Sequence, residues 1–570
     1  MRTLALLLAG LGLAGAAALF PLDQVKPGLR GAGKTVFQGG RIEEFQVEIL
    51  GLMENVGPKQ SLILARLSGG PIAQTGVLQG MSGSPVYIDG KLLGAVAMAF
   101  PFSKEPIAGI RPIGEMLAAA PAQAPPSARV SLQDQDLLAG LPKPMEAIFG
   151  ASRLLEISTP VSFGGFTRQT IERFAPQLRA LGMEPVQGVS AGSAPGGKLG
   201  DPKAIQPGSM ISVHLVTGDF SVGADGTVTH VDGDRVYAFG HRLLAVGSTE
   251  LPFARAEVLA LLPSLATSFK ISASREMMGT ISQDRSTALS GLLGRRAAMV
   301  PVSIAVGRAT YRMEMVNERF LSPFLLQIIA YSAIDATERT VGTGSFAVRG
   351  EFAFAGHAAP VRFDNVYAAD SGAAMQAATM TAIPLAYLMQ GGFDALRLKE
   401  ISLRIEPFDQ KRQWSIDQVY SARPVVRPGE TVDLNISLAG ENGQELVRRA
   451  SFRTPPGLTP GPLFFTVSDA MTRNLTELRP VIGTPPRSAQ QMVAAVNNLK
   501  TNTRMYVRVW RPEPSYQLQG ADLPSPPPSL HMLLARALTP SYSSKLAELE
   551  IEGSGAAITG SKSVTVEVKE

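Results

Sequence analysis

Residues 80–85 read Gly-Met-Ser-Gly-Ser-Pro and place Ser82 between two glycines, in a run bounded by apolar, β-rich segments. A serine in such a tight turn can act as a nucleophile. Gly80 lets the backbone turn, so that its amide and the amide of Ser82 can converge on one point. Such a pair forms an oxyanion hole, which stabilises the tetrahedral intermediate of acyl transfer. We therefore predict Ser82 as the nucleophile, and Gly80 with Ser82 as the oxyanion hole.

Short strands must position this turn. Residues 86–88 are apolar, the dipeptide Asp89-Gly90 is typical of a type I′ hairpin, and residues 92–96 return as a second strand. Upstream, apolar side chains alternate with Glu and Gln over residues 42–52, which predicts a strand with one buried face. The serine is therefore expected in a turn between strands.

A serine needs a base that takes its proton, most often a histidine. Of the five histidines, His241 is the best candidate, because it follows Gly240 at the end of the apolar strand 236–239. The other four are His214 inside an apolar strand, His230 at a turn, His357 in an Ala/Gly-rich turn, and His531 near the C-terminus. We predict His241 as the general base.

The acid that would orient this histidine is harder to assign. Asp284 is the first candidate, because it lies in a polar cluster between apolar segments. An ion pair with Arg285 is an equally good reading of the same residue. Asp232 and Asp234 are closer to the histidine in sequence, but their context is typical of a hairpin turn.

Two resemblances follow from these residues. The turn resembles the Gly-x-Ser-Gly-Gly-Pro motif of chymotrypsin-like and HtrA-like serine proteases, with Ser84 in place of the second glycine. Residues 75–85 more closely resemble the SpoIVB peptidase family, the S55 serine peptidases of spore-forming bacteria. Residues 108–117 are similar to the end of the S55 domain, and residues 236–244 to the Gly-His motif that carries its catalytic histidine. The resemblance implies an exported serine endopeptidase that acts on protein substrates in the cell envelope.

The chain departs from the family pattern in two ways. The histidine precedes the serine in the sporulation peptidases, whereas Ser82 precedes His241 here, which implies a permuted arrangement of two halves. The family's aspartate lies upstream of the serine, where residues 66–69 read Arg-Leu-Ser-Gly and offer no carboxylate. A second hypothesis is therefore a catalytically weak or inactive relative that serves as a peptide-binding or protein-binding scaffold.

One other motif is misleading. Residues 28–35 match the P-loop pattern Gly-x-x-x-x-Gly-Lys-Thr. A P-loop needs a buried strand before it and a helix after it, but prolines bracket residues 21–27 and a strand pattern follows. We interpret the motif as a glycine-rich turn that leads into a strand.

The composition argues against several classes of function and of binding site. The 570 residues carry a net charge of +5 without a Lys/Arg run, which gives nucleic-acid binding no support. The absence of cysteine excludes disulfides, thiolate metal sites and a cysteine nucleophile. We predict no cofactor and no metal ion, and the sequence makes no prediction of oligomeric state.

The N-terminus predicts export. A positive start is followed by an apolar run over residues 4–20, with alanines at 16–18 that suit a cleavage site before Leu19. The protein is expected in the periplasm or outside the cell, and the only predicted route to the membrane is an uncleaved N-terminal signal.

The domains predicted are a signal peptide (1–18), a serine-bearing S55-like half (19–120), a linker (121–145), a histidine-bearing α+β half (146–400) and a C-terminal β-sandwich-like region (401–570). Helical periodicity predicts helices over residues 167–181, 254–265, 323–336 and 373–389. The fold class is thus β-rich and multidomain (α+β), with a chymotrypsin-like/S55 core of two β-rich halves in permuted order and a C-terminal Ig-like β-sandwich.

Overall fold

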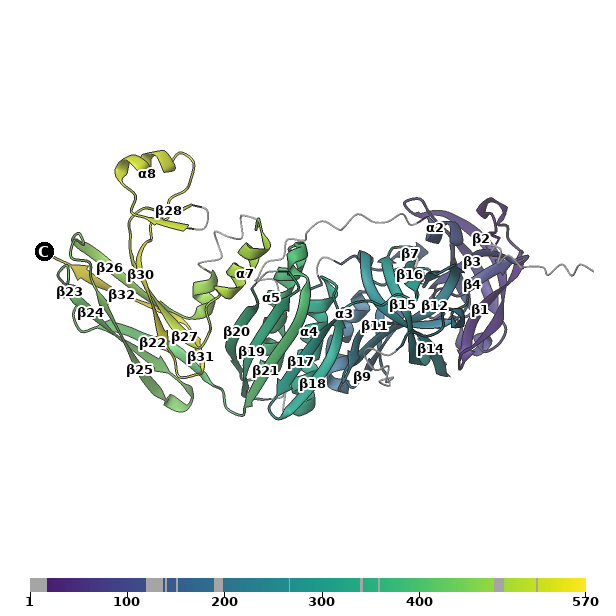
Figure 1. Ribbon diagram of the computed structural model, residues 1–570, viewed down its shortest axis with the longest axis horizontal. Coiled ribbons are helices and arrows are strands. Elements are labelled where there is room, and N and C mark those ends of the chain that lie inside the picture. Colours follow the sequence, from purple (N-terminus) through teal and green to yellow (C-terminus); the bar gives the residue numbers. More distant parts are fainter. Residues whose placement is uncertain are drawn as a thin grey trace, which may run out of the picture. The chain divides into compact units, whose positions relative to one another are not determined.

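The computed structural model describes residues 18–118, 137–138, 141–149, 152–188, 198–265, 267–338, 342–356, 359–475, 486–518 and 521–570. They form two compact units, which divide at Met299–Val300, inside the predicted block 146–400. Nearly all of the predicted signal segment, most of the linker and His357 lie outside the described residues. The arrangement of elements within each unit can be followed in Figure 1.

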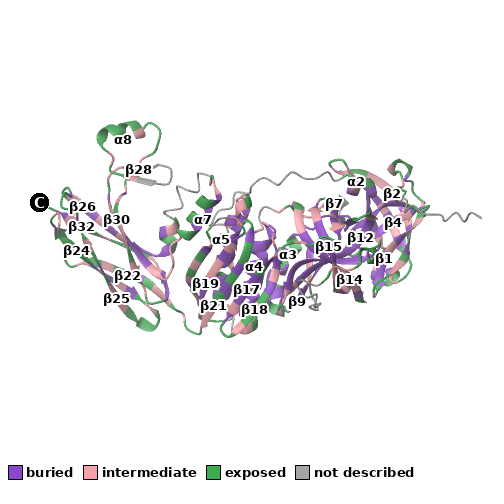
Figure 2. Cartoon of the chain, viewed as in Figure 1, coloured by how far each residue is buried: buried purple, intermediate pink, exposed green. Residues whose placement is uncertain are grey.

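The first unit begins with a closed ring of six strands. They are β1 (Arg30–Gln38), β2 (Arg41–Gly57), β3 (Gln60–Ser68), β4 (Pro85–Ile88), β5 (Lys91–Ala99) and β6 (Ile107–Pro112). Their order is β4-β1-β2-β3-β6-β5, and pairing between β4 and β5 closes the barrel. The alternation seen in the sequence is confirmed, since Phe45, Val47 and Ile49 are at most 2% exposed and face the core. Figure 2 shows such buried positions alternating with exposed ones.

The same unit contains a second ring of six strands. They are β11 (Met210–Gly218), β12 (Ser221–Asp232), β13 (Arg235–Ala238), β14 (Gly247–Leu262), β15 (Phe269–Asp284) and β16 (Leu289–Leu293). The ring runs β12-β13-β16-β15-β14-β11, and a β11–β12 pairing closes it. Both rings therefore follow one order, in which the third strand pairs with the sixth and the fourth pairs with the first.

Shorter elements accompany the two rings. They are α1 (Ile72–Thr75), α2 (Ile113–Leu117), β7 (Glu146–Phe149), β8 (Ser152–Glu156), β9 (Thr159–Gly164), α3 (Arg168–Ala180) and β10 (Met183–Gln187). Helix α3 confirms the helix predicted over 167–181, and the Thr167 side chain caps it by accepting from the amide of Thr170.

The helix predicted over residues 254–265 is wrong, because this segment belongs to strand β14. The Ala- and Leu-rich sequence has helical propensity, but β14 pairs along its length with β15 through several bulges. Pairing with a neighbouring strand outweighs the weak local preference. Residues 30–35 of the P-loop-like run already belong to β1, so the predicted strand is confirmed, whereas the predicted glycine-rich turn is wrong for these residues because they pair with β2.

The second unit starts with five neighbouring strands of a larger sheet and two helices. These are β17 (Met299–Val306), β18 (Ala309–Val316), α4 (Leu321–Thr337), β19 (Gly344–Phe354), β20 (Val361–Ala369), α5 (Ala373–Gln390) and β21 (Leu398–Phe408). The strands lie in the order β18-β17-β21-β19-β20. The helices predicted over 323–336 and 373–389 are confirmed as α4 and α5. Helix α4 is buried from Leu321 to Ile334 and packs against α5. None of the described helices is long and apolar enough to span a membrane.

The C-terminal region contains two larger sheets that share one hydrophobic core. The first sheet has the order β25-β24-β22-β31, and the second has the order β23-β32-β26-β27-β30. Their strands are β22 (Gln413–Ser421), β23 (Val425–Val426), β24 (Thr431–Ala439), β25 (Glu445–Arg453), β26 (Gly461–Ser468), β27 (Arg504–Arg511), β30 (Ser544–Glu552), β31 (Ala557–Thr559) and β32 (Ser561–Val568). This pair of packed sheets has the architecture of a sandwich. The Ig-like topology stays a prediction.

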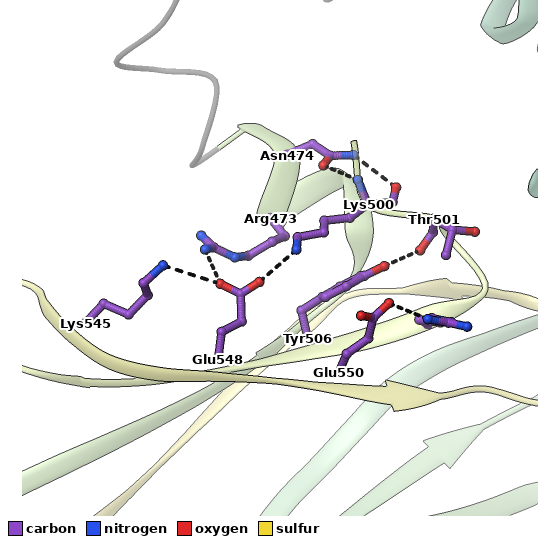
Figure 3. A network of polar contacts seen from close by, with 9 residues as sticks. Arg473, Asn474, Lys500, Thr501, Tyr506, Lys545, Glu548 and Glu550 are labelled. Atoms are coloured by element: carbon purple, nitrogen blue, oxygen red, sulfur yellow. Dashed lines mark hydrogen bonds and ion pairs between the residues drawn. The ribbon is translucent and has the colours of Figure 1, made fainter. Parts of the chain in front are cut away.

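The remaining elements of this region are α7 (Ala489–Asn497), β28 (Ser515–Leu518), β29 (Ala521–Pro524) and α8 (Pro528–Leu534). A polar network on β30 ties neighbouring segments to the second sheet (Figure 3). Glu548 accepts from Arg473 and lies 3.2 Å from the ammonium of Lys500 and 3.9 Å from that of Lys545. One partly buried carboxylate is thus surrounded by three cations, which suits a structural role.

Candidate active site

The serine turn connects β3 and β4 of the first ring. Ser82 is fully buried, and the flanking glycines Gly80 and Gly83 have φ values of +88° and +92°. The amide of Gly83 donates to the carbonyl of Val96 on β5 at 2.8 Å. The amides of Gly80 and Ser82 have no acceptor among the described residues. These two amides are the ones predicted to form the oxyanion hole.

The second ring holds this turn through two threonines of β12. The hydroxyl of Thr227 donates to the carbonyl of Gly80 at 2.8 Å, and the amide of Thr227 donates to the carbonyl of Ser82 at 2.9 Å. The hydroxyl of Thr229 donates to the carbonyl of Gly83 at 2.7 Å. Strand β12 thus binds the carbonyls of Gly80, Ser82 and Gly83. No local sequence pattern links either threonine to the serine, so neither could be predicted from the sequence.

The histidine loop connects β13 and β14 of the second ring. Phe239 adopts a φ of +70° and Gly240 a φ of +67°, directly before His241. A bulky residue in the left-handed region is strained, and such strain gathers at functional sites. His241 is 2% exposed, and its Nδ1 lies 2.6 Å from the carbonyl oxygen of Arg242.

The two loops meet at Val96 of β5. Its carbonyl accepts from Gly83, and a Cβ added to Gly240 would lie 3.3 Å from the same oxygen. A Cβ added to Gly83 would lie 2.5 Å from the amide nitrogen of Phe239. The serine loop and the histidine loop are therefore in direct contact, and each is the connection between the third and fourth strands of its own ring.

The two reactive atoms are unpaired. Ser82 Oγ and His241 Nε2 are both buried and have no hydrogen-bond partner among the described residues. The hydrogen bond of a serine–histidine dyad is therefore not formed in this state. Other buried atoms share this property, among them Ser84 Oγ and both ring nitrogens of His214, so the contact between their loops is what distinguishes Ser82 Oγ and His241 Nε2.

The electrostatics of the histidine favour its neutral form. Burial lowers the pKa of His241 to about 4, and the nearby charges of Arg111 and Arg242 act in the same direction. A carbonyl oxygen can only accept, so Nδ1 carries the proton in its bond to Arg242. The lone pair is then on Nε2, where a general base needs it.

Asp284 lies at the end of β15 and is fully buried. Its carboxylate accepts from the backbone amides of Leu243 at 2.9 Å, Leu244 at 2.8 Å and Val246 at 3.4 Å. Burial raises its pKa, against the lowering effect of these amides. The carboxylate thus holds the loop that follows His241, while the ring itself bonds to the carbonyl of Arg242. A catalytic role for Asp284 stays a prediction.

A buried ion pair supports the same loop. Arg242 Nε lies 3.6 Å from Glu156 Oε2, and both side chains are less than a tenth exposed. Burial raises the pKa of Glu156, while the charge of Arg242 lowers it. The pair anchors the residue whose carbonyl fixes the histidine tautomer. Among the described residues, no group of three or more His, Asp or Glu could hold a metal ion.

Replacing Gly83 with alanine is expected to destabilise the protein by about 3 kcal/mol, because the new Cβ would lie 2.0 Å from the carbonyl oxygen of Thr227. The matched control is Gly90→Ala, where φ is also positive but nothing lies within 4 Å. This control should cost only about 1 kcal/mol. Urea denaturation measures both, and equal losses would contradict the close contact between the loops.

Comparison with known families identifies one segment. Residues 21–111 match the family model described as SpoIVB peptidase S55. The match spans β1 to β6 and includes Ser82, whereas His241 lies beyond it. The resemblance predicted from the sequence is therefore confirmed for this segment, and the family implies a serine peptidase that acts on proteins. No curated protein and no solved structure matches the chain.

Proposed function

We propose that this protein, whose residues 21–111 carry the S55 peptidase segment, is an exported serine endopeptidase with Ser82 as nucleophile and His241 as general base. The single observation that carries the proposal is the contact of the two loops at Val96. It brings a buried, unpaired serine hydroxyl and a buried, unpaired imidazole nitrogen into adjoining segments. Both groups are of the type that acyl transfer requires.

The chemistry follows the logic of a serine–histidine pair. His241 Nε2 takes the proton of Ser82 Oγ as this oxygen attacks the carbonyl carbon of a peptide bond. The negative charge on the carbonyl oxygen is met by the free amides of Gly80 and Ser82. The imidazolium then gives its proton to the leaving amine, and an acyl group remains on Oγ. In the second half of the reaction, His241 takes a proton from water as the water oxygen attacks the acyl carbon. The imidazolium then returns this proton to Ser82 Oγ, and the carboxylic acid product is released.

The two six-stranded rings support a chymotrypsin-like arrangement in permuted order. Both rings have the same strand order, and the two proposed catalytic residues occupy the same connection in their respective rings. Since triads are defined by geometry and not by chain order, placing the serine-bearing ring first is compatible with catalysis.

Two groups take over the work of an orienting acid in this proposal. The carbonyl of Arg242 keeps the proton on Nδ1, and Asp284 fixes the backbone of residues 243–246. A peptide carbonyl stabilises an imidazolium less than a carboxylate does, so modest turnover is expected. Catalysis in this proposal requires His241 Nε2 to come within hydrogen-bonding distance of Ser82 Oγ when substrate binds.

We further propose that the substrates are protein segments bound in extended form along a strand edge beside the serine turn. The apolar N-terminal run supports action in the periplasm or outside the cell. The competing function is a scaffold that binds peptides without cleaving them. The absence of a bond between Ser82 and His241 favours this second candidate.

A fluorophosphonate probe separates the two functions. The purified full-length protein should become labelled, and mass spectrometry of its peptides should place the adduct on Ser82 and not on Ser84. Heat-denatured protein is the control and should not react, because labelling requires the assembled site. Folded protein that stays unlabelled would contradict the peptidase and leave the scaffold.

A further inference from the structure

A buried lysine lies behind the proposed oxyanion hole. Lys270, on β15, is 1% exposed, and its backbone amide donates to the carbonyl of Gln79 at 3.3 Å. The amide of Gln79 in turn donates to the carbonyl of Ser268 at 2.9 Å. A Cβ added to Gly80 would lie 3.3 Å from Cδ of Lys270 and 3.5 Å from its Cβ and Cγ. The aliphatic stem of the lysine therefore packs against the glycine whose amide forms the hole.

The far end of this side chain is anchored in the first ring. Lys270 Nζ donates to the hydroxyl of Thr35 on β1 at 2.7 Å, and Thr35 is fully buried. The charge that acts on this ammonium is that of Asp225 on β12, which is itself buried. The other groups around Asp225 are neutral hydroxyls, those of Ser162, Ser212 and Ser272. One cation and one anion thus share an interior otherwise lined by hydroxyls.

The anion is linked to the other side of the turn. Asp225 lies two residues before Thr227, which bonds to the carbonyls of Gly80 and Ser82. The serine turn is therefore enclosed by the stem of Lys270 and by the β12 segment that carries Asp225. Stability alone does not account for a buried ammonium and a buried carboxylate, because removing either charge from water costs free energy.

We infer that Lys270, together with the buried charge of Asp225, is a positioning residue for the oxyanion hole. Its stem packs against Gly80, whose amide forms the hole, and its ammonium is held by the hydroxyl of Thr35. This inference rests on the proposed peptidase function. It adds a buried lysine and a buried aspartate to a site otherwise built from a serine, a histidine and backbone groups.

Lys270 and Asp225 should give the reaction an unusual pH dependence. Burial lowers the pKa of Lys270 to about 7, against the opposing effect of Asp225, and burial raises the pKa of Asp225 to about 6. A lysine with a lowered pKa is cationic below that value and neutral above it. The positioning effect is therefore expected to weaken as the pH rises through about 7, so that the reaction slows in alkaline solution.

The test compares the rate of fluorophosphonate labelling in the full-length wild type and in the double variant Lys270→Met with Asp225→Asn. Both replacements remove the charge; asparagine keeps the length of aspartate, and methionine keeps most of the lysine stem that packs against Gly80. We expect the double variant to keep its melting temperature, to react about tenfold more slowly, and to lose the fall in rate above pH 7. The control is Lys34→Met, an outward-facing lysine on β1, which should behave as the wild type.

The outcomes can be told apart. A double variant that reacts as fast as the wild type overturns the inference and leaves the peptidase intact. A wild type whose labelling rate does not fall above pH 7 also overturns it, even if the double variant does not fold. A wild type that does not react at any pH overturns the proposed function, and the inference falls with it.

Discussion

Replacement of Ser82 by alanine is expected to lower the rate of protein hydrolysis by at least about 10²-fold, to the level that binding and the oxyanion hole supply by themselves, because no carboxylate of the described residues orients the histidine. The hydroxyl is the only group of the proposed site that forms a bond to the substrate carbon. The fold should survive, because Ser82 Oγ has no hydrogen-bond partner to lose among the described residues. Hydrolysis of a fluorescent, unfolded protein such as labelled casein measures the effect.

The matched control is Ser84→Ala. Ser84 lies two residues away and is equally buried, and its hydroxyl also has no partner in the described part of the chain. Its removal should change the rate by no more than a few fold. If the Ser84 variant were inactive and the Ser82 variant active, the nucleophile would be misassigned. If neither variant differed from wild type, the hydrolysis would come from another protein.

Replacement of His241 by alanine is expected to lower the hydrolysis rate by at least about 10²-fold, as for Ser82, because no other group then takes the serine proton. The matched control is His230→Gln, on β12 of the same ring, where the imidazole stacks on Tyr237. This variant should keep most of the activity. Equal losses in both variants would indicate that the ring is merely sensitive to substitution.

The pH profile of the wild type tests the same residue. A base must be neutral to accept a proton, and burial lowers the pKa of His241 to about 4. The rate kcat/KM should therefore rise as the pH increases through about 4 and be near its maximum at pH 6. A rise centred on the ordinary histidine value of about 6.5 would contradict the buried environment of this base.

Local patterns predicted the parts of the site that depend on near neighbours in the chain. Asp89 and Gly90 both adopt positive φ in the turn between β4 and β5, as their dipeptide predicts. The alternation over residues 42–52 predicted a strand with one buried face, and β2 has one. The glycines around Ser82 predicted a tight turn, and both have left-handed φ.

The structural features that could not be predicted from the sequence share one physical cause. Residues 254–265 have the composition of a helix, and only the presence of β15 makes them a strand. Asp284 is expected to need partners, and it has them. They are backbone amides of the histidine loop, which a pattern of side chains cannot predict. In each case the structure depends on a contact between two segments that no local sequence pattern connects.

The sequence by itself determined the reactive residue types, the tight serine turn and the strand-rich character of the chain, because backbone preferences and burial periodicity act over a few residues. Only the tertiary structure decided that the loop of Ser82 touches the loop of His241, that Thr227 clamps the turn, and that Lys270 packs behind Gly80. These contacts join residues more than 140 positions apart. They arise when two rings of strands pack together, and packing depends on the whole fold.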